Sequence, residues 1–366
     1  MSTALKDRYN VAFYDTFCLA LHTANPDLNL EGFKQSIFTS DFEGFELKQR
    51  MTHSSTVLRQ YLSADFNIAC TQISRTIKTL ETMGIGENFE YMFLPEYVAT
   101  YGIDQFETAF DTLAVITSFT SSEFAVRPFI IKYPTQMVQQ LLHWSKHRDP
   151  KVRRLASEGS RPRLPWAMAL PAYKTDPTPI LLVLENLKND PDEVVRRSVA
   201  NHLNDIAKDN PDITIRFAEA WFGKTPETDA LVKHGCRTLL KQGNDRILKL
   251  FGLGSDHLSL ARFSLDQQEI KMGNRLTFHF KLENLADVVQ MLRLEYAIYL
   301  LKKNGSHSKK VFKISERTLT GLQMLEVSKS HHFTPISTRV YHDGLHKVSI
   351  ILNGKEFHAL DFELRI

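Results

Sequence analysis

The sequence contains very little cysteine and no long hydrophobic run. Its 366 residues include only three cysteines, Cys18, Cys70 and Cys236, which are widely spaced and form no CxxC pair. An odd number of isolated thiols argues against a disulfide framework or a zinc site and fits a reducing cytoplasm. No apolar stretch is long enough to cross a bilayer, and the N-terminal residues do not resemble a secretory signal. We therefore expect a cytoplasmic protein that does not enter a membrane.

Several widespread catalytic motifs are also missing. The sequence has no glycine-rich nucleotide loop, no HExxH helix and no GxSxG turn, which are the signatures of nucleotide-binding, zinc-dependent and serine-dependent enzymes. The 14 histidines are scattered, and the adjacent pair His331 and His332 falls on a predicted strand. Neighbouring strand residues point to opposite faces, so this pair cannot share a metal ion. We expect neither a metal nor a cofactor.

What the sequence does have is a basic segment in its middle. The formal net charge is only +3, but residues 146–163 contain seven basic residues and two acidic ones. A local stripe of lysine and arginine is the electrostatic signature of a nucleic-acid partner. A solvated helix face is the structural alternative for such a stripe. Overall, 43% hydrophobic and 24% charged residues are ordinary for a soluble globular protein.

Residues 1 to about 250 carry helical periodicity and an internal repeat. Apolar residues recur at helical spacing in 45–62, 66–80, 106–119 and 137–144. The segment DPKVRR at 149–154 recurs, with two residues inserted, as DPDEVVRR at 190–197, and the Asp-Pro pairs are 41 residues apart. In each copy Asp is a predicted N-cap and Pro a predicted first helical residue, as in the pairs Thr178-Pro179 and Thr225-Pro226. A helix-pair period near 40 residues predicts HEAT-type repeats stacked into an α solenoid.

The pattern changes to strands near residues 252–255. Apolar and polar residues alternate in 276–282 and nearly so in 292–298, while 348–352 and 357–364 flank the turn pair Asn353-Gly354. A second Asn-Gly pair lies at 304–305, inside a basic loop predicted for 302–310. About seven short strands in such a segment predict an all-β sandwich of immunoglobulin-like type. We therefore predict two domains, at residues 1–253 and 255–366.

One carboxylate stands out within the basic segment. Glu158 lies four residues after Arg154, on the helix that Asp149-Pro150 opens, and Gly159 is predicted to end that helix. The structural alternative is an intrahelical ion pair with Arg154. The helix end instead favours a carboxylate at the mouth of a loop, beside further arginines and a tryptophan. That combination can hold a polyanion and act on a positively charged centre within it.

Two other carboxylates and a tryptophan are weaker candidates from the residues alone. Asp205 lies on the matching helix of the next repeat, where HEAT proteins also use aspartate for inter-repeat hydrogen bonds. Glu123 precedes a helical segment that Ser121 or Ser122 could cap, with Glu123 in its first turn. Trp166 follows Pro165 outside any periodic stripe, which suits stacking on a sugar or base. The other two tryptophans, at 144 and 221, fit helical spacing, and we expect them in the core.

The sequence resembles a known family of DNA repair enzymes. The segment 153–166, with its unusual run SEGSRPRLPW, and the segment 195–211 resemble the AlkC family of bacterial DNA glycosylases. Segments 45–51, 101–106 and 123–129 are similar to its members too. The resemblance extends over essentially the whole chain, including the C-terminal sandwich that one subgroup carries. It implies a HEAT-like repeat glycosylase domain followed by an immunoglobulin-like domain.

The resemblance also implies a reaction and a set of residues. Family members remove 3-methyladenine and 3-methylcytosine from DNA by hydrolysing the N-glycosidic bond. Their active-site carboxylates and tryptophan correspond to Glu123, Glu158, Asp205 and Trp166. We expect the carboxylates to stabilise an oxocarbenium-like sugar and to position a water molecule.

The expected partner is double-stranded DNA that contains alkylated bases, with no obligatory protein partner. We expect a monomer that is cytoplasmic and associates with the bacterial nucleoid during repair. A structural role between repeats is the alternative for some of the arginines. The alternative function is a non-catalytic HEAT-repeat scaffold that binds DNA or an acidic protein. The candidate DNA-binding residues are Arg127, Arg153, Arg154, Arg161, Arg163, Lys302, Lys303, Lys309 and Lys310.

Overall fold

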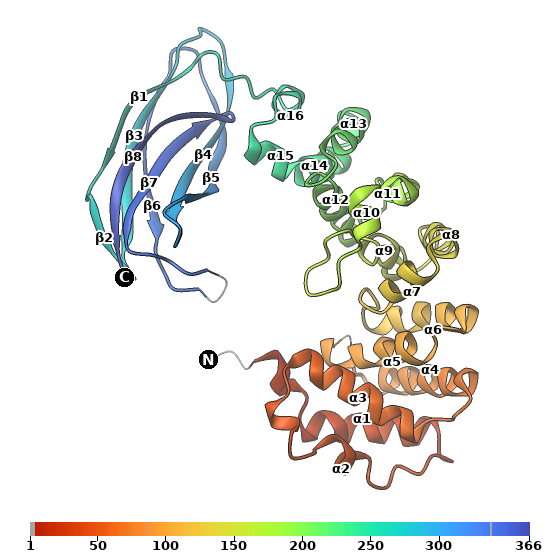
Figure 1. Ribbon diagram of the computed structural model, residues 1–366. Coiled ribbons are helices and arrows are strands. Elements are labelled where there is room, and N and C mark those ends of the chain that lie inside the picture. The colour runs from red at the N-terminus through yellow and green to blue at the C-terminus, as the bar shows by residue number, and fades with distance from the viewer. Residues whose placement is uncertain (1–3, 87, 337–338) are drawn as a thin grey trace. The chain divides into compact units, whose positions relative to one another are not determined.

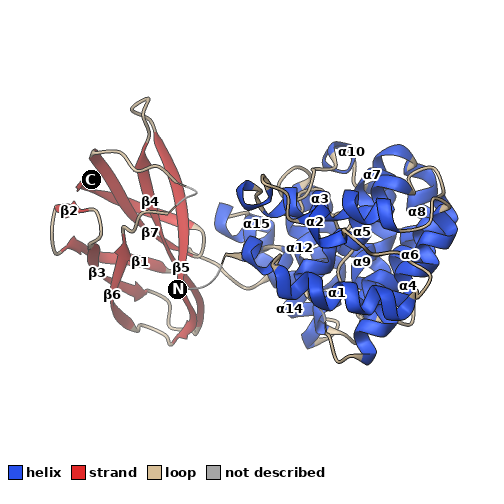
Figure 2. Ribbon diagram, turned by 90° about the horizontal axis from the view of Figure 1, so that it is seen from below, coloured by secondary structure: helices blue, strands red, loops and turns tan. Residues whose placement is uncertain are grey.

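A computed structural model describes residues 4–86, 88–336 and 339–366 of the chain (Figure 1). Its first part is helical and its last part consists of strands, as the secondary-structure colours of Figure 2 show. The fold is an α solenoid of HEAT-like repeats followed by an all-β immunoglobulin-like sandwich, which confirms the predicted fold class. By internal contacts, residues 1–210 and 223–235 form unit 1, and residues 211–222 and 236–366 form unit 2. The predicted boundary at 253–255 stays a prediction.

Unit 1 consists of α-helices of 5 to 17 residues and shorter 3-10 helices (Figure 1). None of the helices in the described part of the chain is long and apolar enough to cross a membrane. The helices of unit 1 are α1 (Val11–Ala24), α2 (Phe33–Ile37), α3 (Leu47–Tyr61), α4 (Phe66–Thr82), α5 (Phe93–Tyr101), α6 (Phe106–Phe119), α7 (Val126–Lys132), α8 (Pro134–Trp144), α9 (Pro150–Glu158), α10 (Pro171–Thr175), α11 (Leu181–Leu187), α12 (Glu193–Ile206) and α14 (Pro226–Gly235), with 3-10 helices η1 (Leu5–Arg8), η2 (Phe42–Gly44), η3 (Phe89–Met92) and η4 (Thr178–Ile180).

The repeat at 149 and 190 sets up the two helices on which the site is built. Asp149 caps α9 by accepting the N–H of Lys151, with Pro150 as the first helical residue, as predicted. The second cap prediction is wrong, because α12 is capped by Asp192, two residues beyond Asp190. The two inserted residues move the helix start, and Asp190 instead accepts the N–H of Asp192. Helix α12 packs between α9 and α14, so that successive repeats bury one another's apolar faces.

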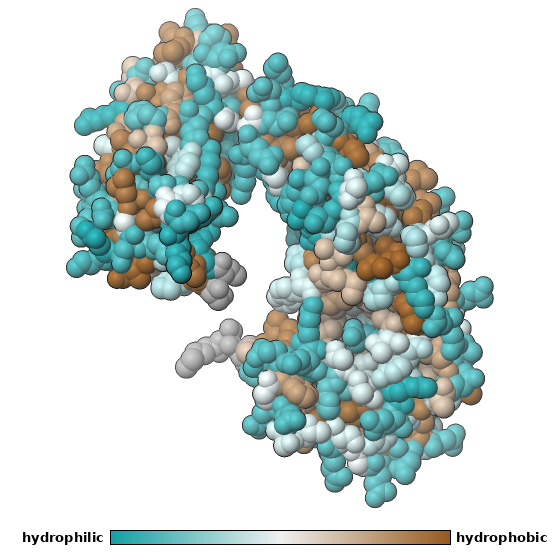
Figure 3. Space-filling model, viewed as in Figure 1, coloured by the Kyte–Doolittle hydropathy of each residue, from teal (hydrophilic) through white to brown (hydrophobic). Residues whose placement is uncertain are grey.

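The helix stack and the sandwich each have a hydrophobic core. Trp144 and Trp221 are each 2% exposed, which confirms that they are core residues. On the face that Figure 3 shows, hydrophilic residues dominate and hydrophobic ones form separate small patches. Scattered apolar residues of this kind are normal on a protein surface.

Unit 2 contains eight strands among its described residues, against about seven predicted. Three strands form one sheet in the order β1-β3-β6, and five form the other in the order β2-β8-β7-β4-β5. Leu276, Phe278, Leu294 and Ile350 lie in the core between them. The elements of unit 2 are α13 (Pro211–Trp221), α15 (Arg237–Gln242), α16 (Asp245–Leu250), β1 (Leu258–Leu265), β2 (Glu269–Lys271), β3 (Arg275–Asn284), β4 (Gln290–Leu301), β5 (His307–Leu319), β6 (Met324–His332), β7 (Gly344–Leu352) and β8 (Lys355–Arg365).

The two Asn-Gly pairs of unit 2 both lie in turns. Asn353 and Gly354 connect β7 to β8 with positive φ angles of 46° and 79°, which confirms the predicted hairpin. The pair at 304–305 turns between β4 and β5. The predicted basic loop is shorter than expected, because β5 already begins at His307. Lys302 and Lys303 are therefore in the turn, whereas Lys309 and Lys310 belong to a strand.

Candidate active site

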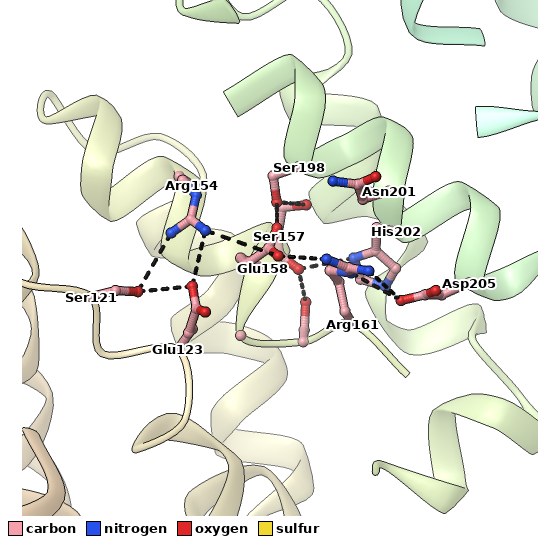
Figure 4. A network of polar contacts seen from close by, with 12 residues as sticks. Ser121, Glu123, Arg154, Ser157, Glu158, Arg161, Ser198, Asn201, His202 and Asp205 are labelled. Carbon is pink, nitrogen blue, oxygen red and sulfur yellow. Dashed lines mark hydrogen bonds and ion pairs between the residues drawn. The ribbon is translucent and has the colours of Figure 1, made fainter. Parts of the chain in front are cut away.

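Three segments of unit 1 bring the candidate carboxylates into one network (Figure 4). The turn before α7 carries Glu123, the C-terminus of α9 carries Glu158, and the last turn of α12 carries Asp205. Gly159 allows the first two segments to meet. A Cβ at this position would lie 2.5 Å from Cγ2 of Val126, the first residue of α7. Only a glycine lets the end of α9 approach α7 this closely.

Glu123 is the most accessible of the three carboxylates, and its side chain is 16% exposed. Its Oε2 accepts the Ser121 hydroxyl at 2.9 Å and Nη2 of Arg154 at 2.9 Å. Helix capping, the structural alternative for this segment, does not occur, since α7 begins at Val126 without a side-chain cap and Ser121 binds the carboxylate instead. Among the residues that the structure describes, none donates to the other oxygen, Oε1. Glu123 therefore presents one free oxygen.

Glu158 occupies the centre of the network and is only 8% exposed. Its Oε1 accepts Nη1 of Arg161 at 2.5 Å, and its Oε2 accepts the Ser198 hydroxyl at 2.5 Å. The intrahelical pair with Arg154 also exists, but at a longer distance of 3.9 Å. Helix α9 ends at Glu158, as predicted, so the carboxylate meets the loop that carries Arg161.

Arg161 joins Glu158 to Asp205. Its Nε and Nη2 both lie 2.9 Å from Oδ2 of Asp205. Lys208 donates to the other oxygen, Oδ1, at 3.0 Å. Burial alone would lower the pKa of the Arg161 guanidinium, but Glu158 and Asp205 outweigh it and the pKa is raised. The Asp205 side chain is only 2% exposed, so in this arrangement both of its oxygens are occupied by cations.

Two supporting residues of α12 were missed by sequence reasoning. Ser198 and His202 lie seven and three residues before Asp205, which places them on the same helix face. Nδ1 of His202 lies 3.0 Å from the Ser157 carbonyl oxygen, and its Nε2 is buried without a partner. Burial and the nearby Arg161 lower the pKa of His202 to about 3, so that this ring is neutral at pH 7. The helical spacing back from Asp205 was the signal that could have found both residues.

Trp166 stands outside the core with 61% of its surface exposed. Its φ of 64° is in the left-handed region, which is strained for a bulky side chain. Its ring meets the Phe89 ring edge-on, with centroids 6.3 Å apart, and Lys48 donates a hydrogen bond to its carbonyl oxygen. Strain at an exposed aromatic residue favours a functional position over a packing role. The adjacent hollow is lined by Lys48, Glu96, Phe124, Pro128 and Met168, among others.

The arginines that were predicted to contact phosphate differ in how accessible they are. Arg127 is wholly buried and donates to the carbonyl oxygens of Gly159, Arg161 and Met168. A guanidinium without exposed surface cannot reach a phosphate, so the DNA-contact prediction is wrong for Arg127, which holds the loop after α9 in place. Burial lowers its pKa to about 10, so it stays charged.

The remaining arginines keep some accessible surface. Arg153 forms a forked pair with Asp190 and is 15% exposed, and Arg163 forms one with Asp209 and is 37% exposed. Arg154 is 29% exposed. These pairs also connect repeats, which was the structural alternative for the arginines. Their DNA contacts stay predictions.

The four candidate lysines of the sandwich, Lys302, Lys303, Lys309 and Lys310, are exposed at the surface of unit 2. Lys309 is already paired with Glu356 at 2.6 Å, which reduces its capacity to bind phosphate. Lys302 and Lys303, in the β4–β5 turn, are the better candidates.

In this arrangement the network carries one more positive charge than negative charges. Glu123, Glu158 and Asp205 supply three negative charges, while Arg154, Arg161, Lys208 and the buried Arg127 supply four positive ones. Carboxylates held by hydrogen bonds beside arginines can attract a cation or orient a water molecule, provided that some of this positive charge is moved away. Within residues 4–86, 88–336 and 339–366, no cluster of three His, Cys, Asp or Glu side chains is arranged to hold a metal ion.

Comparisons with known proteins agree on one family. Residues 103–239 match the family described as "DNA alkylation repair enzyme", and residues 259–366 match "Uncharacterised protein YhaZ, C-terminal Ig-like domain". The protein YhaZ of Bacillus subtilis (strain 168) is 36% identical over 361 residues, which cover 98% of this chain and 99% of YhaZ.

A solved structure matches the whole chain. The alkylpurine DNA glycosylase AlkC of Pseudomonas fluorescens, bound to DNA containing an abasic site analog, is 33% identical, with full coverage of both chains and a TM-score of 0.93. The helical repeats, the sandwich and these two relatives together show that the chain belongs to the AlkC family of DNA glycosylases, in the subgroup with a C-terminal immunoglobulin-like domain.

Proposed function

We propose that the protein excises cationic alkylated bases, 3-methyladenine and 3-methylcytosine, from double-stranded DNA. The observation that carries the proposal is the network in which Glu123, Glu158 and Asp205 meet beside Arg154 and Arg161. Support comes from the AlkC structure, which is bound to DNA with an abasic site analog and has the same fold over its full length. The protein acts as a monomer, since hydrolysis at one lesion needs no symmetry.

The chemistry suits an electrostatic mechanism. Alkylation at N3 places a positive charge on the base and makes it a good leaving group. As the base departs, the deoxyribose develops oxocarbenium character, which a nearby carboxylate stabilises. One charge pair at about 4 Å is worth roughly 4 kcal/mol at an effective dielectric constant near 20, or about a thousandfold in rate. That factor suffices for a charged lesion, and a normal base is left intact.

The three carboxylates have different roles, which follow from their hydrogen-bond partners and their accessibility. Glu123 orients the attacking water, because its Oε1 is free and its side chain is the most accessible. Asp205 and Glu158 supply negative charge next to the sugar. Trp166 lies against the lesion's deoxyribose. None of the three carboxylates serves as the acid that a neutral leaving base would require, so the enzyme is selective for cationic lesions.

The test is chromatographic identification of bases released from dimethyl-sulfate-treated DNA. The wild-type protein should release 3-methyladenine and 3-methylcytosine, and Asp205→Asn should release them at least tenfold more slowly. Glu193→Gln is the matched control, because Glu193 lies on the same helix in an exposed pair with Arg197. Efficient release of hypoxanthine or uracil would contradict the selectivity for cationic bases.

One observation favours the scaffold alternative. Both oxygens of Asp205 are occupied by cations, as expected of a carboxylate that only joins repeats. A protein that binds methylated DNA but releases no base would support this second function.

A further inference from the structure

The charge balance of the network raises a question for the proposed function. A developing oxocarbenium ion is stabilised by net negative charge, yet the DNA-free network carries three negative and four positive charges. With that balance the site repels a cation. Some of the positive charge therefore has to move away before the carboxylates can act.

The four cations differ sharply in how firmly they are held. Arg127 has no exposed surface and donates to three carbonyl oxygens. Arg161 is 8% exposed and bridges two carboxylates. By contrast, Lys208 is 40% exposed and Arg154 is 29% exposed. Exposed ion pairs contribute little to stability, whereas buried ones are costly to break. Only the last two cations can leave at low cost.

The geometry of Asp205 permits such a departure. Arg161 holds Oδ2, while Lys208 contacts only Oδ1. If Lys208 swings away, Oδ1 becomes free and Oδ2 still fixes the carboxylate in place. Glu158 behaves likewise, because Arg161 and Ser198 hold its two oxygens when Arg154 leaves. Ser121 keeps its hydrogen bond to Glu123.

We propose that Lys208 and Arg154 are exchangeable counter-ions, which neutralise the carboxylates in the free protein and move to backbone phosphates when DNA binds. This inference rests on the proposed glycosylase function. Three carboxylates then face Arg161 and Arg127 alone, and the balance changes from +1 to −1. DNA phosphates thus activate the site. Lysine suits the role, because its ammonium group sits on a long flexible stem.

The experiment neutralises phosphates one at a time. A duplex with a single 3-methylcytosine carries one methylphosphonate at each position around the lesion in turn, on either strand. Single-turnover release is measured at saturating protein, so that weaker binding does not affect the rate. For the wild-type protein, a methylphosphonate at one or more positions should slow release about tenfold. The neutral linkage there no longer attracts Lys208 away from Asp205.

Lys208→Gln should restore the rate at that position, since the masking charge is already absent. The same variant should reduce the slope of log affinity against log salt by about one. Arg154→Gln should rescue a different position. Arg197→Gln is the matched control, because Arg197 is an exposed cation on α12 that pairs with Glu193, and it should rescue none.

Equal slowing of wild type and Lys208→Gln by every methylphosphonate would overturn the proposal. The proposal would also be overturned if Lys208→Gln released the base at least tenfold more slowly than wild type from both the fully charged duplex and the methylphosphonate duplex. That result would mean that Lys208 is needed to hold Asp205 in place. Failure of the proposed function itself looks different: no base is then released even from the fully charged duplex.

Discussion

Replacing Arg161 by methionine perturbs the network at its centre. Methionine fills a similar volume but leaves Glu158 and Asp205, which are 8% and 2% exposed, without their shared counter-ion. Removing one partner of a buried ion pair costs about 3–5 kcal/mol. In a domain of this size each kcal/mol lowers the melting temperature by roughly 2–4 °C. We expect the melting temperature of the helical domain to be roughly 10 °C lower in Arg161→Met than in the wild-type protein.

Calorimetry of the full chain provides the assay, and two further variants separate charge from packing. The triple variant Glu158→Gln/Arg161→Met/Asp205→Asn removes the orphaned charges too and should regain more than half of the loss. Arg163→Met is the matched control. The Arg163 side chain is 37% exposed, and its forked pair with Asp209 is worth about 1 kcal/mol or less.

Two outcomes would contradict this account of Arg161→Met. A variant that melts within about 2 °C of wild type would refute the reasoning. A triple variant as unstable as the single one would show that packing, rather than charge, causes the loss.

Three further predictions concern individual side chains of the site. His202, whose pKa burial lowers to about 3, takes up a proton on unfolding below its ordinary pKa of 6.5. Stability therefore falls as pH drops below 6.5, and a denaturant titration should show His202→Asn losing about 1.4 kcal/mol less than wild type between pH 7.5 and 5.5. An equal loss would contradict this. Trp166→Gly relieves a left-handed residue, so the free energy of unfolding should hold or rise, by up to about 1 kcal/mol, while single-turnover release slows. A less stable variant would make Trp166 a packing residue. Ser198→Ala leaves a buried Glu158 oxygen without its donor and should cost about 1–3 kcal/mol in denaturant, more than Ser160→Ala, whose hydroxyl bonds a helix carbonyl; an equal cost would contradict this.

Much of the fold could be predicted from local signals. Periodicity placed the helices and strands, and Asp149-Pro150 and Asn353-Gly354 marked a helix start and a hairpin. The failures were also local. The cap moved from Asp190 to Asp192 because two inserted residues offered a second aspartate, and β5 began earlier than the basic loop suggested.

The site was predictable in its residues but not in its connections. Gly159 correctly placed Glu158 at a helix end beside a loop. The bridge from Glu158 through Arg161 to Asp205 depends on how that loop folds back, which no periodicity encodes. The charge of Arg127 suggested phosphate contact, but its guanidinium is buried and donates hydrogen bonds to three backbone carbonyl oxygens. Composition cannot distinguish an arginine that holds a loop from one that meets DNA.

Binding to a charged sugar mimic tests the central claim most directly. The measurement compares the affinity of the full chain for duplexes with a cationic pyrrolidine or a neutral tetrahydrofuran in place of one nucleoside. If the carboxylates stabilise positive charge on the sugar, the wild-type protein prefers the pyrrolidine duplex at least tenfold, about 1.4 kcal/mol. Asp205→Asn and Glu123→Gln should each reduce that preference. Equal affinity of the wild-type protein for the two duplexes would contradict the account.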